Sequence, residues 1–206
     1  MSSSVDIANA ALSKLGAARI TSLTDANKGA RAMNARLERL RDTELEAYPW
    51  RFAIVRTTLP ALSTAPAYGY ARQFQRPVND LRPVMVGGYA INAATIGVQY
   101  SGASNYSPAE APYEIIGATI QTNLSAPLEY EYVSRVTDSG LFPPLFVEAL
   151  ACRLAMDACE ELTQSASKIE AAAKMYSRAI AEARRVNAIY RPPVRRVPGS
   201  FIQSRA

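Results

Sequence analysis

The sequence predicts an α+β protein: an antiparallel helical bundle formed by both ends of the chain, a small antiparallel β domain inserted between them, and an extended C-terminal arm. Apolar residues recur at steps of three and four near both ends, as in amphipathic helices. The middle of the chain carries short β-prone runs around glycines, and the end carries Pro192, Pro193 and Pro198. We therefore expect the bundle at residues 1–49 and 143–191, the β domain at 50–142 and the arm at 192–206.

The first helix is expected directly after Ser3. Ser3 and Asp6 have the spacing of a capping pair, in which each side chain binds the other residue's backbone. The apolar positions that follow have helical spacing: Val5, Ala8, Leu12 and Leu15. Gly16 is the natural end of this helix, since glycine readily adopts the left-handed conformation found after helices.

A second helix is expected to begin near Thr24 or Asp25 and to end before Pro49, because the residue preceding a proline avoids the helical region. Its predicted buried stripe is Ala26, Ala30, Met33, Leu37 and Leu40. The charged residues between these positions are interpreted as a solvated face: Arg31, Glu38, Arg39, Arg41 and Asp42.

The stretch from Leu141 to Tyr190 predicts a helical hairpin. Pro143 and Pro144 suit a first helical turn, where the missing N–H has no helical partner. The stripe of the third helix is Val147, Leu150, Leu154, Ala158 and Leu162. After the polar run 163–167, Ser167 and Glu170 have the spacing of a capping box. The stripe of the fourth helix is Ile169, Ala172, Ala173, Tyr176, Ile180 and Ala183. A short link between two helices favours antiparallel neighbours.

The middle of the chain predicts strands. The runs 84–86 and 89–91 flank Gly87-Gly88, and the runs 113–116 and 119–122 flank Gly117-Ala118, so each pair predicts a hairpin. Further β-prone positions indicate a first strand with Phe52, Ile54, Val55 and Leu59 and a last strand with Tyr130, Tyr132 and Val136. The stretch 93–112 is expected to be a long loop.

The composition argues against an enzyme. The chain has no histidine, the commonest general base and metal ligand, and no phosphate-binding loop, metal-spaced cluster or nucleophile elbow. We therefore expect no cofactor and no metal. Asp157, Glu160 and Glu161 are interpreted as a solvated helix face. Cys152 and Cys159 lie two helical turns apart, roughly 10 Å by helical rise and too far for a disulfide, and are interpreted as small buried hydrophobes. No signal peptide or membrane span is predicted.

The net charge is +5, with a pI near 9.3. Arginines concentrate near the C-terminus: Arg184, Arg185, Arg191, Arg195, Arg196 and Arg205. Such an excess is typical of a protein that binds nucleic acid or an acidic partner, and also of a solvated tail. Aromatic residues and arginines alternate at Tyr68, Tyr70, Arg72, Phe74 and Arg76, as in a stacking platform for single strands. Core or interface packing is the favoured interpretation of this alternation.

The order of several motifs resembles the tail tubular protein A family of short-tailed bacteriophages. No single motif is specific, but their order and spacing run over most of the chain. They are Ala10-Ala11-Leu12; Tyr48-Pro49-Trp50-Arg51-Phe52-Ala53; Tyr68-Gly69-Tyr70-Ala71 with Phe74, Pro77 and Asp80-Leu81-Arg82; Tyr113-Glu114-Ile115; Tyr132-Val133 with Asp138; Phe142-Pro143-Pro144-Leu145-Phe146-Val147-Glu148-Ala149-Leu150; Tyr176; and Ala183-Arg184.

The resemblance implies a structural virion protein without enzymatic activity. It implies a homo-oligomeric ring, twelve-fold in this family, which forms the head-to-tail adaptor between the portal protein and the tail nozzle protein. Phage DNA would pass through its channel without sequence-specific binding, and the protein would be made in the host cytoplasm and reside in the virion neck. A siphovirus-type head completion protein and a basic nucleic-acid-binding module are the alternatives.

The arm is predicted to bind the portal or a neighbouring subunit. Its prolines exclude a helix, and it carries apolar anchors between arginines that suit carboxylate partners. The candidate partner-binding residues are Arg191, Val194, Arg195, Arg196, Val197, Phe201 and Ile202. A second candidate interface consists of Tyr68, Tyr70, Arg72 and Phe74.

Overall fold

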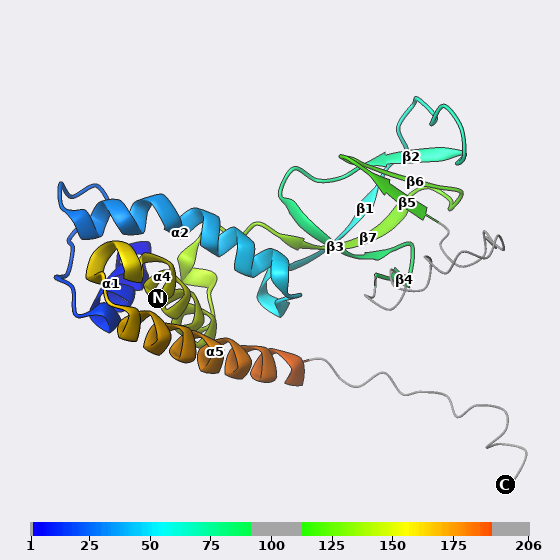
Figure 1. Ribbon diagram of the computed structural model, residues 1–206. Helices are drawn as coiled ribbons and strands as arrows, with labels where there is room; N and C mark the ends of the chain where they lie inside the picture. The colour runs from blue at the N-terminus through cyan, green and yellow to red at the C-terminus, as the bar shows by residue number, and fades with distance from the viewer. Residues whose placement is uncertain (1, 92–112, 191–206) are drawn as a thin grey trace, which may run out of the picture.

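A helical body and a β body lie end to end in the computed structural model, which describes residues 2–91 and 113–190 (Figure 1). The predicted α+β class is confirmed. The helices are α1 (Ser4–Leu15), α2 (Lys28–Ala47), α4 (Pro144–Thr163) and α5 (Ala166–Ile189). The strands are β1 (Ile54–Leu59), β2 (Arg72–Gln75), β3 (Asp80–Val86), β4 (Tyr89–Ala90), β5 (Tyr113–Ile116), β6 (Thr119–Thr122) and β7 (Leu128–Ser134). The predicted loop 93–112 and the arm 192–206 lie outside the described residues.

The first helix agrees with its prediction at both ends. The Ser3 hydroxyl accepts a hydrogen bond from the Asp6 N–H at 3.1 Å, and the Asp6 carboxylate accepts one from the Ser3 N–H at 2.9 Å. Gly16 ends the helix with φ 71°, a left-handed conformation that glycine adopts without steric cost. Ala8, Leu12 and Leu15 are buried.

The predicted start of the second helix is wrong, because two side chains compete for the backbone ahead of it. The Asp25 carboxylate closes a turn by accepting hydrogen bonds from the N–H groups of Thr21 and Ser22. Asn27 then caps α2 by accepting the Ala30 N–H at 2.8 Å, so the helix begins at Lys28. Ala26 therefore precedes the helix and is exposed, whereas the other predicted stripe residues of α2 are buried.

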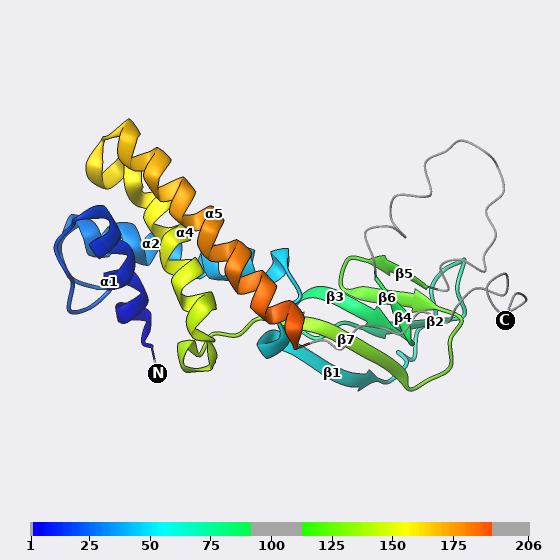
Figure 2. The same ribbon diagram turned by 90° about the horizontal axis from the view of Figure 1, so that it is seen from below.

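Helices α4 and α5 form the predicted antiparallel hairpin and lie side by side (Figure 2). Pro144 is the first residue of α4, after Pro143 at the cap position. The chain turns through Gln164, which has φ 49°. The predicted capping box of Ser167 and Glu170 is wrong, because α5 already begins at Ala166 and both residues are exposed on it.

The β body consists, in its described part, of a four-stranded sheet in the order β1-β7-β3-β4 and a three-stranded sheet in the order β2-β6-β5. Both predicted hairpins are confirmed as β3–β4 and β5–β6. Phe52 and Val136 fall outside the strands predicted to hold them, Phe52 in a short 3-10 helix (Arg51–Ala53). The side chains between the sheets form a second core: Leu59, Phe74, Val86, Ile120, Leu128, Tyr130 and Tyr132.

An aromatic cluster fills the junction where the chain passes between the two bodies. We call it the junction cluster; it comprises Tyr48, Trp50, Phe52, Phe142 and Phe146. The Phe146 ring centroid lies 5.0 Å from that of Trp50, 4.9 Å from that of Phe52 and 5.1 Å from that of Phe142, all in edge-to-face geometry. The Trp50 indole N–H donates to the Glu44 carbonyl at 2.7 Å. The junction cluster thus joins residues about ninety positions apart in the sequence into one core.

Candidate partner-binding surface

Two of the three acidic residues weighed for catalysis link α4 to α2. The Asp157 carboxylate accepts hydrogen bonds from Arg36 at 3.1 Å and Arg39 at 3.0 Å, and Glu161 pairs with Arg36 at 2.7 Å. Glu160 is exposed. Glu161 is also exposed, as predicted for a solvated face, whereas Asp157 is half-buried; both carboxylates pair with arginines of α2. Because these side chains are partly exposed, each pair contributes little to stability.

The described residues contain no group of three or more histidine, cysteine or carboxylate side chains that could hold a metal ion. Cys152 and Cys159 are free and buried, as interpreted from their positions, and burial raises the pKa of the Cys152 thiol. No helix in the described part of the chain is long and apolar enough to cross a membrane.

The alternating aromatic and arginine residues near β2 do not share one surface. Tyr68 is 88% exposed, but Phe74 is fully buried between the sheets, so Phe74 does not belong to an interface as predicted. The Arg72 guanidinium donates to the carbonyls of Asn123 and Leu124 at 3.3 and 3.2 Å. Tyr70 is half-buried. Without the Phe74 ring, this segment lacks the run of exposed rings on which successive bases would stack.

A buried carboxylate organises one end of the β body, and sequence reasoning missed it. The Asp80 side chain is 0% exposed; it accepts a hydrogen bond from Arg76 at 2.8 Å and another from the Tyr130 hydroxyl. Burial, followed by the hydrogen bond to Asp80, raises the pKa of Tyr130 above its ordinary value. The spacing of Arg76 and Asp80 was available in the sequence, but Tyr130 lies fifty positions away.

A second buried carboxylate, Glu44 on α2, was also missed. Its side chain accepts a hydrogen bond from the Tyr176 hydroxyl of α5 at 2.6 Å and lies 3.7 Å from the Arg153 guanidinium of α4. Arg153 also stacks over the Tyr176 ring, 5.1 Å from its centroid. Burial, with the hydrogen bond to Glu44, raises the pKa of Tyr176 to about 12. This group joins the three helices α2, α4 and α5.

Replacing Tyr176 by phenylalanine should lower the free energy of unfolding by about 1–3 kcal/mol at pH 7, because Glu44 loses a hydrogen-bond donor in a buried place. The loss should shrink as the pH rises. The folded state holds Tyr176 neutral, so its contribution is complete below its ordinary pKa of 10 and disappears as the pH approaches 12. Urea unfolding at pH 7, 10 and 11 measures this; a difference that stays constant across these values would contradict the assignment.

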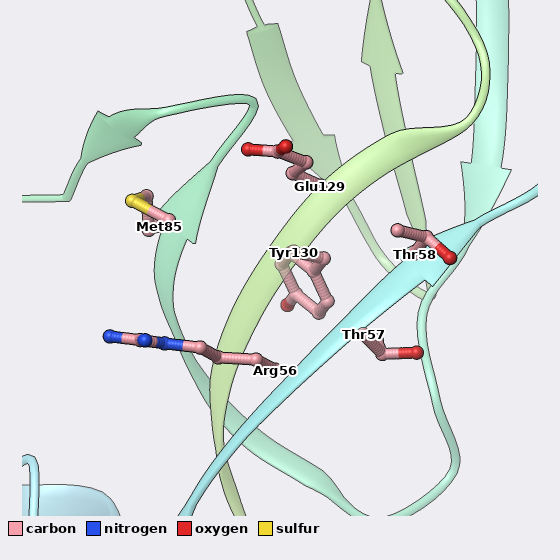
Figure 3. A pocket seen from close by; sticks show the side chains of 6 residues that line it. All are labelled: Arg56, Thr57, Thr58, Met85, Glu129 and Tyr130. Atoms are coloured by element: carbon pink, nitrogen blue, oxygen red, sulfur yellow. The ribbon is translucent and has the colours of Figure 1, made fainter.

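The four-stranded sheet carries a shallow polar hollow of about 720 Å³. It is lined by Arg56, Thr57, Thr58, Met85, Glu129 and Tyr130, which come from β1, β3 and β7 (Figure 3). Arg56 is already paired with Glu131 at 2.8 Å. The lining offers hydroxyl and carboxylate groups but no activated nucleophile, and its breadth suits a polar segment of a partner better than an enclosed ligand.

An apolar pocket of about 180 Å³ opens between the start of α4 and the end of α5. We call it the α4–α5 pocket. It is lined by Trp50, Pro143, Pro144, Leu145, Phe146, Ala183, Val186, Asn187 and Tyr190. Tyr190, which belongs to this lining, is 71% exposed, and Ile189, the last residue of α5, is 68% exposed. Such exposed apolar surface marks sites of protein–protein contact. The pocket is therefore the strongest candidate partner-binding surface among the described residues.

Only one of the two predicted partner-binding sets, residues 68–74, falls within the described residues. The arm residues Arg191 to Ile202 lie outside the described residues, whereas Tyr190, at which α5 passes into the arm, lines the α4–α5 pocket. Sequence reasoning missed this pocket, because its walls come from three distant segments. No known protein-family model matches this chain, and no curated protein sequence matches it.

Proposed function

We propose that the chain is the subunit of a phage head-to-tail adaptor ring, which joins the portal protein to the tail nozzle and surrounds the DNA channel. The proposal starts from the sequence resemblance. Its two most extended motifs, residues 48–53 and 142–150, pack against each other in the junction cluster through Trp50 and Phe146. Residues that form one core give a physical reason for two distant motifs to occur together.

The observation that carries the proposal is the exposed apolar surface at the end of α5. Ile189 and Tyr190 are exposed at the end of α5, where the arm begins, and Tyr190 lines the α4–α5 pocket. Within the described part of the chain these side chains stay exposed, and tyrosine is a residue type enriched in interface cores. The adjoining arm adds Arg191, Arg195 and Arg196, which suit carboxylates on the portal or on a neighbouring subunit.

The proposed partners follow from this role. The chain would form a homo-oligomeric ring of twelve copies, with the portal on one side and the nozzle on the other. DNA would pass through without sequence-specific contacts, the protein would reside in the virion after synthesis in the host cytoplasm, and no enzymatic activity is proposed.

Truncation of the arm tests the proposed contact with the portal. A chain ending at Arg191 should keep the helicity of the full chain, because no buried stripe of α1, α2, α4 or α5 is removed. Its affinity for the portal should fall at least tenfold. Sedimentation with purified portal at several salt concentrations measures this. Equal affinity of the truncated and full chains at every salt concentration would show that the arm does not bind the portal.

A nucleic-acid-binding module is the less supported alternative. The net charge of +5 favours it, but the buried Phe74 and the engaged Arg72 argue against a stacking platform, which was the less favoured interpretation of this segment. Such a module would bind DNA with an affinity that falls steeply with salt concentration. The adaptor proposal predicts only weak DNA binding that does not depend on sequence.

A further inference from the structure

We propose that strand β1 of one copy of this chain pairs with strand β5 of a second copy, and that Arg56 meets Glu114 across this contact. The inference rests on the proposed function, because it names one contact between neighbouring subunits of the ring. A strand at the edge of a sheet can pair with a strand of another chain through its backbone. The free edges of the two sheets therefore decide where such pairing can occur.

The described part of the β body has four edge strands, and two of them are protected. The outer strands of the two sheets are β1 and β4 in one sheet and β2 and β5 in the other. The described part of β4 has only two residues, and very short edge strands resist pairing. The outer edge of β2 is covered, because Ala61 forms a bridge with Phe74 and the Leu62 N–H donates to the Gln73 carbonyl at 2.9 Å. Within the described residues, β1 and β5 are the edges that remain open.

Both open edges have features that favour pairing. Neither Ile54–Leu59 nor Tyr113–Ile116 contains the proline or lysine that often protects an edge strand. Each strand also has an exposed apolar side chain: Val55 is 37% exposed on β1, and Ile116 is 49% exposed on β5. Pairing with a second chain would reduce the exposure of both side chains.

The charges of the two strands select a mixed pair. Arg56 is the one charged residue of β1 and Glu114 is the one charged residue of β5, and both are exposed. A ladder of two β1 strands would hold two guanidinium groups, and a ladder of two β5 strands would hold two carboxylates. The mixed ladder offers opposite charges instead. Arg56 already pairs with Glu131 at 2.8 Å, but its side chain is 77% exposed and has five N–H donors, so it can bind a second carboxylate.

An antiparallel register exists in which every opposite pair is compatible. The four opposite pairs are Ile54–Ile116, Val55–Ile115, Arg56–Glu114 and Thr57–Tyr113. Two pairs are apolar, one joins opposite charges and one joins a β-branched with an aromatic residue, and pairs of these kinds stabilise antiparallel ladders.

The side chains in this register also face the matching sides of the two sheets. Ile115 packs against the second core of its own chain, and Val55 lies opposite Tyr132, a member of that core. Directly opposite residues in a ladder share a face of the sheet. The pair of Val55 and Ile115 would therefore extend the core side, whereas Arg56 and Glu114 would meet on the exposed side.

The two open edges lie on opposite sides of the β body, as Figure 2 shows for β1 and β5. Their pairing joins different surfaces of the two chains. Such a heterologous contact, repeated from copy to copy, produces a closed ring or an open filament. Pairing of one edge with its own copy would stop at a dimer. The β1–β5 contact therefore suits the proposed ring.

Disulfide trapping between two variants tests the inference. One chain carries Ile54→Cys and the other carries Ile116→Cys, so both keep Arg56 and Glu114. Mixed with and without purified portal and mildly oxidised, they should give a disulfide-linked heterodimer on a non-reducing gel. Wild-type chains, whose two cysteines are buried, should give none. Gln75→Cys in place of Ile116→Cys should give at least fivefold less heterodimer, because Gln75 is exposed but lies on β2, whose outer edge is covered.

Three further variants test the charge pair and the register. Adding Glu114→Arg to the Ile116→Cys chain should reduce the yield at least threefold, because two cations would then meet. Glu170→Arg, the same change of charge at an exposed position of α5, should leave the yield unchanged. Thr58→Cys in place of Ile54→Cys should reduce the yield at least fivefold, because Thr58 lies four residues along the same strand. Equal yields with Glu114→Arg or with Thr58→Cys would overturn the assigned register.

The outcome separates this contact from the adaptor function. A disulfide-linked homodimer of either single variant, in a yield equal to that of the mixture, would show that a strand pairs with its own copy and would overturn the mixed pair. The absence of any heterodimer, with or without portal, would also overturn it. Portal binding by the same variants would in that case leave the adaptor function standing, whereas a heterodimer that never binds portal would contradict the adaptor function alone.

Discussion

Replacing Phe146 by alanine should lower the free energy of unfolding by about 3–5 kcal/mol, the range measured for large aromatic side chains removed from well-packed cores. Phe146 is 1% exposed, and its ring meets those of Trp50, Phe52 and Phe142 in the junction cluster. Alanine would leave a cavity that these three rings, anchored on different segments, can fill only in part. Urea unfolding followed by circular dichroism measures the change.

The control is the removal of an aromatic ring that is exposed and not packed in a core. Tyr68→Ala removes a side chain that is 88% exposed and should change the free energy of unfolding by less than about 0.5 kcal/mol. If Phe146→Ala cost less than about 1 kcal/mol, the junction cluster would not be the core that joins the two bodies.

Replacing Asp80 by alanine should cost about 3–5 kcal/mol, the range for breaking a buried ion pair by removing one partner. The Asp80 side chain is fully buried, and its loss would leave the Arg76 guanidinium, 18% exposed, and the Tyr130 hydroxyl without this acceptor. The damage should be confined to the β body. Near-ultraviolet circular dichroism and chemical unfolding measure it, and the far-ultraviolet helical signal should persist in the folded variant.

A double-mutant cycle gives the sharper test of Asp80. Tyr130→Phe alone removes one donor and should cost about 1–3 kcal/mol. In the Asp80→Ala background the same change should cost clearly less, because the hydrogen bond is already absent. Strictly additive costs would show that Asp80 and Tyr130 do not act together.

Local signals in the sequence predicted most elements of the fold. Pro143-Pro144 marked the start of α4, Gly16 the end of α1, and the glycines at 87–88 and 117 the turns of both hairpins. Each of these residues imposes its conformation through its own backbone, so no distant partner is needed. The start of α2 was missed because Asp25 and Asn27 both offer side-chain acceptors to the backbone, and only the folded geometry shows which of them caps the helix.

The buried polar groups and the pocket depended on distant contacts. Glu44 meets Tyr176 across 132 positions, and its placement within helix α2 looks like that of any charged helix residue. The walls of the α4–α5 pocket come from Trp50, the start of α4 and the end of α5. The apolar periodicity within a single segment cannot show which distant segments will contact each other. Phe74 confirms the core packing that was favoured for this alternation, but it does not belong to the candidate interface, because its strand turns its side chain into the core.

Electron microscopy of the full chain mixed with purified portal protein tests the central claim most directly. The adaptor proposal predicts a ring of this chain that is twelve-fold in projection and lies on one face of the portal. The end of α5 in each subunit should be directed toward the density of the portal or of a neighbouring subunit. A chain that stays monomeric and never joins a ring in the presence of the portal, under conditions where its helicity shows that it is folded, would contradict the proposal.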